Sequence, residues 1–563
     1  MILLNPKNYQ VKHDDPKTTE LIQKTIEFFE QKGLASIKED DQASRWCDDF
    51  LSFIGEEKVF ATMLTPKGYG QPDSRWDMSR IAEYNEILGF YGLSFWYMWQ
   101  VTILGLGPIW MSPNEDLKKK AAQDLLDGGI FAFGLSERAH GADIYSTEMT
   151  LTPKGDGTYL ASGSKYYIGN GQKAAMVSTF GKMADTGDYV FFNADPKHSN
   201  YHVVKKIETS GVRPAFVAAY DLKDYPVTED QILSKGDEAF ASGLNTVNIG
   251  KFELGFASIG ISTHAFYEAI RHATHRNLYG RSVTDFPHVK KLFVESYARL
   301  TAMKLYGLRA ADYMRVASSE DRRYLLYNPI MKMKVTSQGE QVVGMLHDVI
   351  AAKGFEQDTY FEMAIRDIGM LPKLEGTTHV NMALIIKFIQ NYFFKPTDYP
   401  EIPRQMGMDD DAYLFQQTSG KLGDVKFPAY DRPYGGIELS NVKIFKSQVE
   451  DFKQLLMKAP PTPEQSKNVD FLLAGGELFT LIAYAQLILE NRPHMDVGDA
   501  LTNQIFNFMV RDFSSFALHM VLNHQLTPEQ ETIYQAMIKK PDHDLDGFSE
   551  VWNKEVKRLE SAY

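Results

Sequence analysis

One glutamate stands out because its neighbours suit acid–base chemistry. Glu375 lies between Leu374 and Gly376 in the segment LPKLEGTTHVN, and His379 follows shortly after. A carboxylate that is held out of water has a raised pKa and can act as a general base, and glycine lets the backbone approach a substrate closely. Ordinary solvated loops also contain Glu-Gly-Thr, so this tripeptide alone leaves both interpretations open.

Other segments place polar residues and glycines at fixed spacing along the chain. They read SERAHGAD at residues 136–143, KYYIGNG at 165–171, VNIGKF at 247–252, RNLYGRSVTDFP at 276–287 and RD at 366–367. Taken in this order with Glu375, the set resembles the acyl-CoA dehydrogenase family, whose motifs include T-E-P-x-A-G-S-D, K-x-W-I-T-N-G, L-N-x-G-R, R-x-x-F-G and Y-E-G-T. The resemblance covers residues 20–400.

The resemblance implies a fold that is mostly α with a central β domain. We expect an N-terminal helical domain at 1–130, a middle β-barrel or β-sandwich domain at 131–250, and a four-helix bundle carrying the base at 251–400. Residues 401–563 are expected to form an additional C-terminal helical domain, similar to that of the members that act on very long chains.

The resemblance also gives Glu375 a role. In the family, the base takes the α-proton of an acyl-CoA thioester while a hydride leaves the β-carbon for flavin N5, and the product is a trans-2-enoyl-CoA. Some members carry the base just before the arginine of L-N-x-G-R. That position is Gly250 here, which has no side chain to act as a base.

Several departures from the family pattern fall on the residues expected to bind FAD. Tyr167 replaces a tryptophan that covers the flavin ring, and Gly169 replaces a threonine whose hydroxyl bonds near N5. Arg276 matches an arginine that reaches the FAD diphosphate of a neighbouring subunit, although it is equally typical of a surface helix. The residues expected to contact FAD are Phe133, Leu135, Ser136, Gly141, Tyr167, Ile168, Gly169, Arg276, Ala351, Ala352 and Thr377.

Three of these residues also have ordinary structural interpretations. Phe133 and Leu135 alternate as core residues of a strand do, and Ser136 is typical of a turn or helix cap. For the acyl-CoA substrate, the resemblance indicates Ala142, Asn248, Lys251 and Gly376. Lys251 there replaces an arginine and offers a point charge rather than a planar fork.

Local patterns predict the elements that must position these residues. Asp15 followed by Pro16 predicts a helix start, and Ser112 with Glu115 three residues later predicts a second start with a capping box. Strands are predicted in the stretches GTYLASGSKYYI, YVFFNA and YHVVKKI. The uncharged stretch 88–114 is long enough to span a bilayer, but its glycines and proline favour a buried core or an apolar-ligand tunnel.

Composition excludes several classes of protein. The net charge is −13 and no basic stripe is present, which argues against nucleic-acid binding. Cys47 is the single cysteine, so the chain has no intrachain disulfide, and neither His140 nor His379 belongs to a recognisable metal-ligand pattern. We therefore predict no metal. The first residues lack the pattern of a targeting segment, and a cytoplasmic location is expected.

The leading hypothesis is an FAD-dependent acyl-CoA dehydrogenase that acts on a medium-to-long or bulky acyl chain and passes electrons to an electron-transfer flavoprotein. An acyl-CoA oxidase or flavin-dependent monooxygenase on the same fold is the alternative, and a non-catalytic, nucleic-acid-associated member is a remote one. A homodimer or homotetramer is expected. The C-terminal domain either packs on the core or makes peripheral contact with a membrane.

Overall fold

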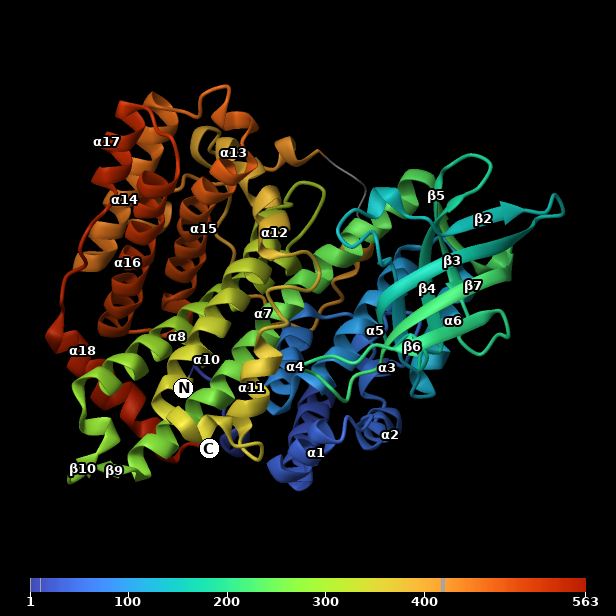
Figure 1. Ribbon diagram of the computed structural model, residues 1–563, viewed down its shortest axis with the longest axis horizontal. Coiled ribbons are helices and arrows are strands. Elements are labelled where there is room, and N and C mark those ends of the chain that lie inside the picture. Colours follow the sequence, from blue (N-terminus) through green and yellow to red (C-terminus); the bar gives the residue numbers. More distant parts are fainter. Residues whose placement is uncertain (1, 11, 417–420) are drawn as a thin grey trace. The chain divides into compact units, whose positions relative to one another are not determined.

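A computed structural model describes residues 2–10, 12–416 and 421–563 of the chain (Figure 1). Its contacts divide the chain into two units. The β unit comprises residues 10, 12–257 and 406–416, and the helical unit comprises residues 2–9, 258–405 and 421–563. This division groups the predicted N-terminal helices with the strands. The boundaries of the four predicted domains stay a prediction.

The β unit begins with helices. They are α1 (Pro16–Gln42), α2 (Asp48–Glu56), α3 (Val59–Leu64), α4 (Met78–Tyr91), α5 (Leu93–Met111) and α6 (Glu115–Leu126). Asp15 caps α1, as predicted, by accepting a hydrogen bond from the Lys17 amide. The predicted start at Ser112 is wrong: Asn114 caps α6, because its side chain accepts from the Leu117 amide while the Ser112 hydroxyl donates to the Leu233 carbonyl.

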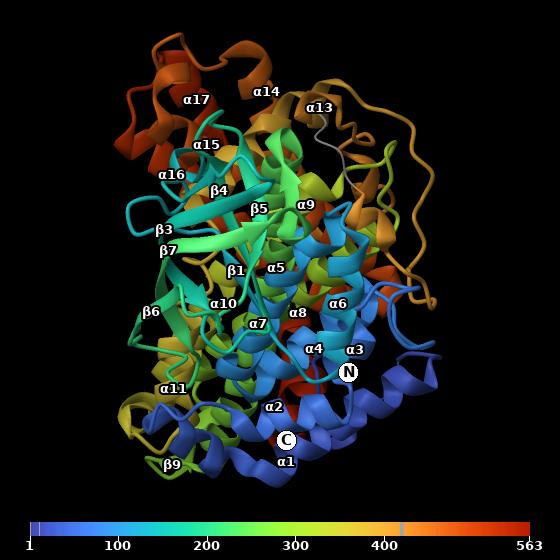
Figure 2. The ribbon, with the colours of Figure 1, turned by 90° about the vertical axis from the view of Figure 1, so that its right-hand side faces the viewer.

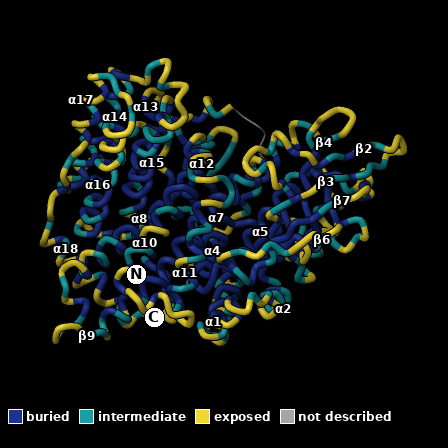
Figure 3. Tube along the Cα trace, viewed as in Figure 1, coloured by how far each residue is buried: buried dark blue, intermediate teal, exposed yellow. Residues whose placement is uncertain are grey.

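Helix α5 forms most of the apolar stretch that resembled a membrane span. All its residues except the last are buried within the protein, as the dark trace in Figure 3 shows. The prediction of a buried core element is therefore confirmed. Among the described residues, one helix, α15 (Val469–Asn491), is long and apolar enough to cross a membrane by length and composition, and 72% of its apolar window is buried inside the protein.

The strands of the β unit form one mixed sheet (Figure 2). Its order is β6-β7-β3-β2-β4-β5-β8, and β1 pairs with β4 in parallel. The bounds are β1 (Phe131–Gly134), β2 (Thr150–Pro153), β3 (Thr158–Gly169), β4 (Met176–Met183), β5 (Tyr189–Ala194), β6 (Tyr201–Lys206), β7 (Val217–Thr228) and β8 (Ile232–Lys235). The three predicted strands coincide with β3, β5 and β6. Strands β1, β2, β4, β7 and β8 lie outside these three stretches.

Helix α7 (Gly236–His275) starts in the β unit and ends in the helical unit. A two-stranded hairpin, β9 (Asn277–Leu278) with β10 (Arg281–Ser282), follows it. The other helices of this unit are α8 (Pro287–Arg315), α9 (Tyr324–Ile330), α10 (Thr336–Ile350), α11 (Tyr360–Ile368), α12 (Thr378–Ile385), α13 (Ile389–Phe394), α14 (Ser440–Lys458), α15, α16 (Asp499–Asn523), α17 (Pro528–Ala536) and α18 (Leu545–Val551). Helices α14 to α17 lie side by side, and α15 and α16 pack against α8 (Figure 1).

Candidate active site

Glu375 lies in the loop between α11 and α12 of the helical unit. Its φ is 53° and that of Gly376 is 87°, so two consecutive residues adopt the left-handed conformation. Glycine accepts this conformation without strain, which accounts for Gly376. Thr377 then caps α12, its hydroxyl accepting from the Val380 amide. Glu375 is partly buried and its Oε2 atom is enclosed by protein, so this carboxylate is not that of a fully solvated loop.

The end of β1 and the end of β3 meet in the β unit. The Ser136 carbonyl accepts a hydrogen bond of 3.0 Å from the Tyr166 amide. Phe133 is buried and stacks on Phe191 with ring centroids 5.9 Å apart, so its side chain serves the core. Leu135 and Ser136, in contrast, are only partly buried. The structure thus brings these two residues beside the neighbouring Tyr166–Tyr167 pair.

Tyr167 and Gly169 have opposite environments although they are close in sequence. The Tyr167 side chain is 62% exposed on a backbone with a φ of 63°. Ile168 and Gly169 are buried, and a Cβ atom at Gly169 would lie 2.6 Å from Val101 Cγ2. Close packing against α5 therefore explains why residue 169 is glycine, because the side chain of a threonine at this position would clash with α5.

A buried ion pair fixes the turn after β1, and the sequence analysis assigned it no role. Lys165 Nζ lies 2.8 Å from Glu137 Oε1 and donates to the Leu135 carbonyl at 3.0 Å. Burial lowers the pKa of Lys165 to about 8 although Glu137 opposes this shift. Burial alone would raise the pKa of Glu137, but the ammonium and the hydrogen bonds from Thr147 and Glu148 lower it. Glu137 belongs to the motif SERAHGAD and Lys165 to KYYIGNG, so the sequence pointed to both residues but not to their pairing.

The same turn brings three candidate metal ligands together. Ligand atoms of Glu137, His140 and Glu148 lie within 4.8 Å of one another. The sequence showed no such cluster, because its members are not at a recognisable spacing. The Lys165 ammonium already neutralises Glu137, so these contacts favour an ion pair over a metal centre. The prediction of no metal stays a prediction.

The remaining predicted residues lie in several places. Gly141 and Ala142 are exposed in the β unit, while Asn248 and Lys251 are buried on α7. Gln100 of α5, which the sequence analysis did not single out as a site residue, donates to the Gly250 carbonyl at 3.1 Å and so holds this part of α7. In the helical unit, Arg276 is partly buried directly after α7, and Ala351 and Ala352 are exposed after α10.

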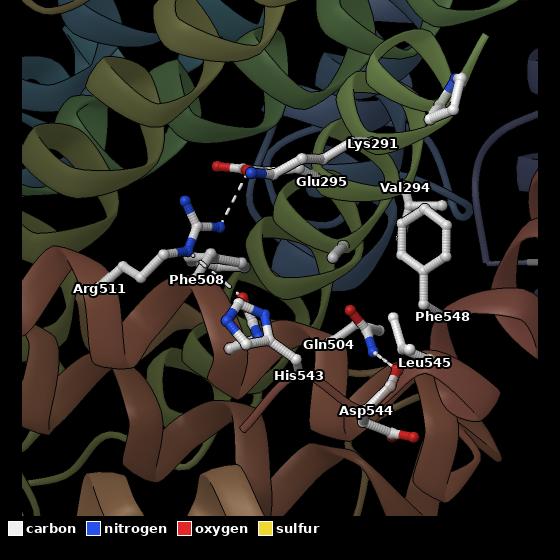
Figure 4. A pocket seen from close by; sticks show the side chains of 13 residues that line it. Lys291, Val294, Glu295, Gln504, Phe508, Arg511, His543, Asp544, Leu545 and Phe548 are labelled. Carbon is white, nitrogen blue, oxygen red and sulfur yellow. Dashed lines mark hydrogen bonds and ion pairs between the residues drawn. The ribbon is translucent and has the colours of Figure 1, made fainter. Parts of the chain in front are cut away.

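A pocket of the helical unit contains none of the predicted site residues (Figure 4). It lies between α8, α16 and α18 and has a volume of about 270 Å³. Lys291, Glu295 and Arg511 line one part of it, and Phe548 lines another. This pocket is therefore separate from Glu375 and from the residues expected to bind FAD or the acyl-CoA.

Comparison with known proteins identifies the family. Residues 240–390 match the family model described as acyl-CoA dehydrogenase, C-terminal domain. A 3-(aryl)acrylate reductase of Clostridium sporogenes is 22% identical over 373 residues, which are 65% of this chain and 97% of that protein. A subunit of the caffeyl-CoA reductase–Etf complex of Acetobacterium woodii is 22% identical over 374 residues, which are 65% of this chain and 96% of that subunit. The family model and these relatives support an acyl-CoA dehydrogenase family member.

A solved acyl-CoA dehydrogenase of Bacillus anthracis, in complex with FAD, has the same fold over nearly its whole length. The TM-score is 0.76 at 15% identity, and the match covers 99% of this chain and 97% of that one. This match confirms the fold class, mostly α with a central β domain. The family model and the curated relatives support an oxidoreductase that acts on CH–CH groups.

The β unit of this acyl-CoA dehydrogenase family member offers surfaces that suit a flavin. The exposed Tyr167 ring can stack on a planar aromatic system, and the partly buried Leu135 and Ser136 leave backbone groups beside it. Gly169 offers no side chain and packs against α5. The residues present therefore fit the flavin, with the departure at Gly169 that the sequence predicted.

Proposed function

We propose that this protein binds FAD and dehydrogenates an acyl-CoA thioester between its α- and β-carbons, with Glu375 as the base. The observation that carries the proposal is the placement of Glu375: a partly buried carboxylate held in a left-handed turn, followed by a glycine. Gly250 cannot take its place. Partial burial keeps a carboxylate from being fully solvated, which favours its action as a base.

The protein's own groups have separate tasks in this proposal. Glu375 takes the α-proton, the electron pair of the α C–H bond forms the Cα=Cβ double bond, and a hydride leaves the β-carbon. FAD, when bound, supplies the two-electron acceptor for that hydride. Tyr167 and Ser136 would contact the flavin when it is bound, and Asn248 and Lys251 of α7 would bind the acyl-CoA. The product is a trans-2-enoyl-CoA.

The relatives support a second candidate function, in which the same site catalyses the reverse reaction, reduction of the Cα=Cβ double bond. The names 3-(aryl)acrylate reductase and caffeyl-CoA reductase describe reduction of a conjugated double bond. A group that removes an α-proton in one direction returns it in the other, so Glu375 serves both. We propose a medium-to-long or bulky acyl group as the substrate and an electron-transfer flavoprotein as the redox partner, because one relative belongs to an Etf complex.

Glu375→Gln tests the role of the base. The substitution preserves side-chain volume, so bound flavin should remain, while reduction of the flavin by saturated acyl-CoAs should slow at least about 100-fold. Anaerobic absorbance measures both quantities in one titration. Glu550→Gln is the control, because Glu550 is an exposed glutamate on α18. This variant should keep the flavin content and the reduction rate of the wild-type protein.

The same titration separates the candidate reactions. Bleaching by saturated acyl-CoAs supports dehydrogenation, whereas reoxidation of reduced protein by aryl-acryloyl-CoAs supports the reductase. Rapid stoichiometric oxygen consumption by the reduced protein indicates an oxidase or monooxygenase instead. Wild-type reduction rates in Glu375→Gln would place the base elsewhere.

A further inference from the structure

The loop that carries Glu375 is held in an unfavourable conformation. Non-glycine residues rarely adopt a positive φ, yet Glu375 has a φ of 53° directly before Gly376. Such a conformation persists only where surrounding contacts impose it. Two buried side chains of the helical unit donate hydrogen bonds to this loop, one on each side of the glutamate.

Asn381 anchors the loop on its C-terminal side. It is fully buried in the first turns of α12, and its Nδ2 donates at 3.0 Å to the carbonyl of Gly376 and at 3.0 Å to that of Thr377. Both acceptors follow Glu375 directly in the chain. One amide group therefore fixes the two peptide units next to the carboxylate.

Lys332 anchors the loop on its N-terminal side. It lies in a π-helical turn, Met331–Val335, that follows Pro329 of α9. A proline removes one helical hydrogen bond, and π-helical turns occur frequently at functional sites. Lys332 is fully buried, and its Nζ donates to the Pro372 carbonyl at 2.6 Å.

We propose that Lys332 and Asn381 are positioning residues that hold the carboxylate of Glu375 in its working place. This inference rests on the proposed function, in which Glu375 is the base. A base acts only within hydrogen-bond reach of the proton it removes, and a displacement of about 1 Å costs on the order of 100-fold in rate. A strained loop without its anchors relaxes and moves its carboxylate away.

Asn381→Leu removes both donors of the C-terminal anchor at similar volume. Asn391→Leu is the matched control, because Asn391 is also buried in the helical unit and its Nδ2 donates to two carbonyls, of Gly423 at 2.8 Å and Val425 at 2.9 Å. Both variants should lower thermal stability. Only Asn381→Leu should lower kcat, by about 10- to 100-fold with KM little changed.

A readout that needs neither flavin nor substrate completes the test. In Asn381→Leu, the amides of residues 370–381 should exchange faster with deuterated water, and in Asn391→Leu they should not. Lys332→Met should increase exchange in the same segment and lower kcat, and Lys332→Arg, which keeps a cationic donor, should restore part of kcat. The lysine variants keep the inference testable if Asn381→Leu does not fold.

Combination with Glu375→Gln separates failure of the inference from failure of the proposed function. If Asn381 acts through the base, Asn381→Leu should cause no further loss in the Glu375→Gln background. An unchanged kcat in Asn381→Leu and Lys332→Met, or an equal loss in Asn391→Leu, would overturn the positioning role alone. A wild-type rate in Glu375→Gln would overturn both.

Discussion

At the scale of single residues, Ala351 has a backbone conformation suited to glycine. Its φ is 59° and its ψ is −143°, a region that costs a non-glycine residue about 1–3 kcal/mol. The side chain is exposed, so no packing compensates for the strain. This protein therefore has an alanine side chain on a backbone conformation that suits glycine.

Ala351→Gly should stabilise the protein by about 1 kcal/mol, because relief of strain exceeds the added flexibility of the unfolded chain. Denaturant unfolding measures the change. Ala352→Gly is the control: Ala352 is also exposed but has no positive φ, so it should lose about 0.5–1 kcal/mol. Equal losses in the two variants would show that Ala351 is not strained.

Motifs located some residues of the candidate site, but not their surroundings. Glu375 and Gly376 could be found because a short local pattern defines them. The environment of Gly169 could not, because the Tyr97 and Val101 side chains that exclude a larger residue come from a helix distant in sequence. The anchors Lys332 and Asn381 are likewise set by tertiary contacts. No local pattern distinguishes them from other buried polar residues.

At the scale of elements, a charged cap organises the start of α1. Asp15 accepts hydrogen bonds from the Lys17 amide and from the Thr18 hydroxyl, and Arg75 Nη1 lies 2.7 Å from its Oδ2. Burial alone would raise the pKa of Asp15, but the hydrogen bonds from Thr18 and Arg75 lower it to about 2. The ionised form is thus the one that the folded protein prefers.

A lowered pKa in the folded state gives stability that is present above the ordinary value and is lost as pH falls. For Asp15 the loss should occur between pH 3.8 and about 2. Asp15→Asn keeps a capping oxygen without the charge, so its unfolding free energy should fall less steeply over this range. Asp14→Asn, which removes an exposed carboxylate next to Asp15 in the chain, is the control for the change in net charge. Parallel curves for Asp15→Asn and wild type would contradict this linkage.

Elements with local start signals or apolar patterns could be predicted, and others could not. The cap at Asp15 and the burial of α5 follow from short patterns. Strand β7 contains Pro226 and two aspartates, which are poor strand formers, and its pairing with β3 and β6 makes it a strand. Helix α6 is capped by Asn114 rather than Ser112, because the Asn114 side chain accepts from the Leu117 amide while its Nδ2 is held by the distant Asp230 and Ile232 carbonyls.

At the scale of the whole chain, residues 421–563 share one unit with residues 258–405. Buried ion pairs join the two segments. Arg299 of α8 binds Asp512 of α16 at 2.9 Å, and Arg309 of α8 binds Glu490 of α15 at 3.1 Å. Both arginines are almost fully buried. Helices α15 and α16 therefore form part of the core around α8 and are not a surface addition to it.

A chain that ends at residue 405 should consequently fail to form a stable helical unit. It would expose the part of α8 that bears Tyr306, whose ring lies 4.9 Å from that of Tyr484, and would remove the α16 partner of Arg299 and the α15 partner of Arg309. Exposed apolar area of this kind leads to aggregation. Size-exclusion chromatography and circular dichroism should show aggregated protein with no cooperative unfolding. A soluble, cooperatively folded chain that retains flavin absorbance would instead support the predicted domain boundary at residue 400, and the C-terminal helices would then be an independent addition.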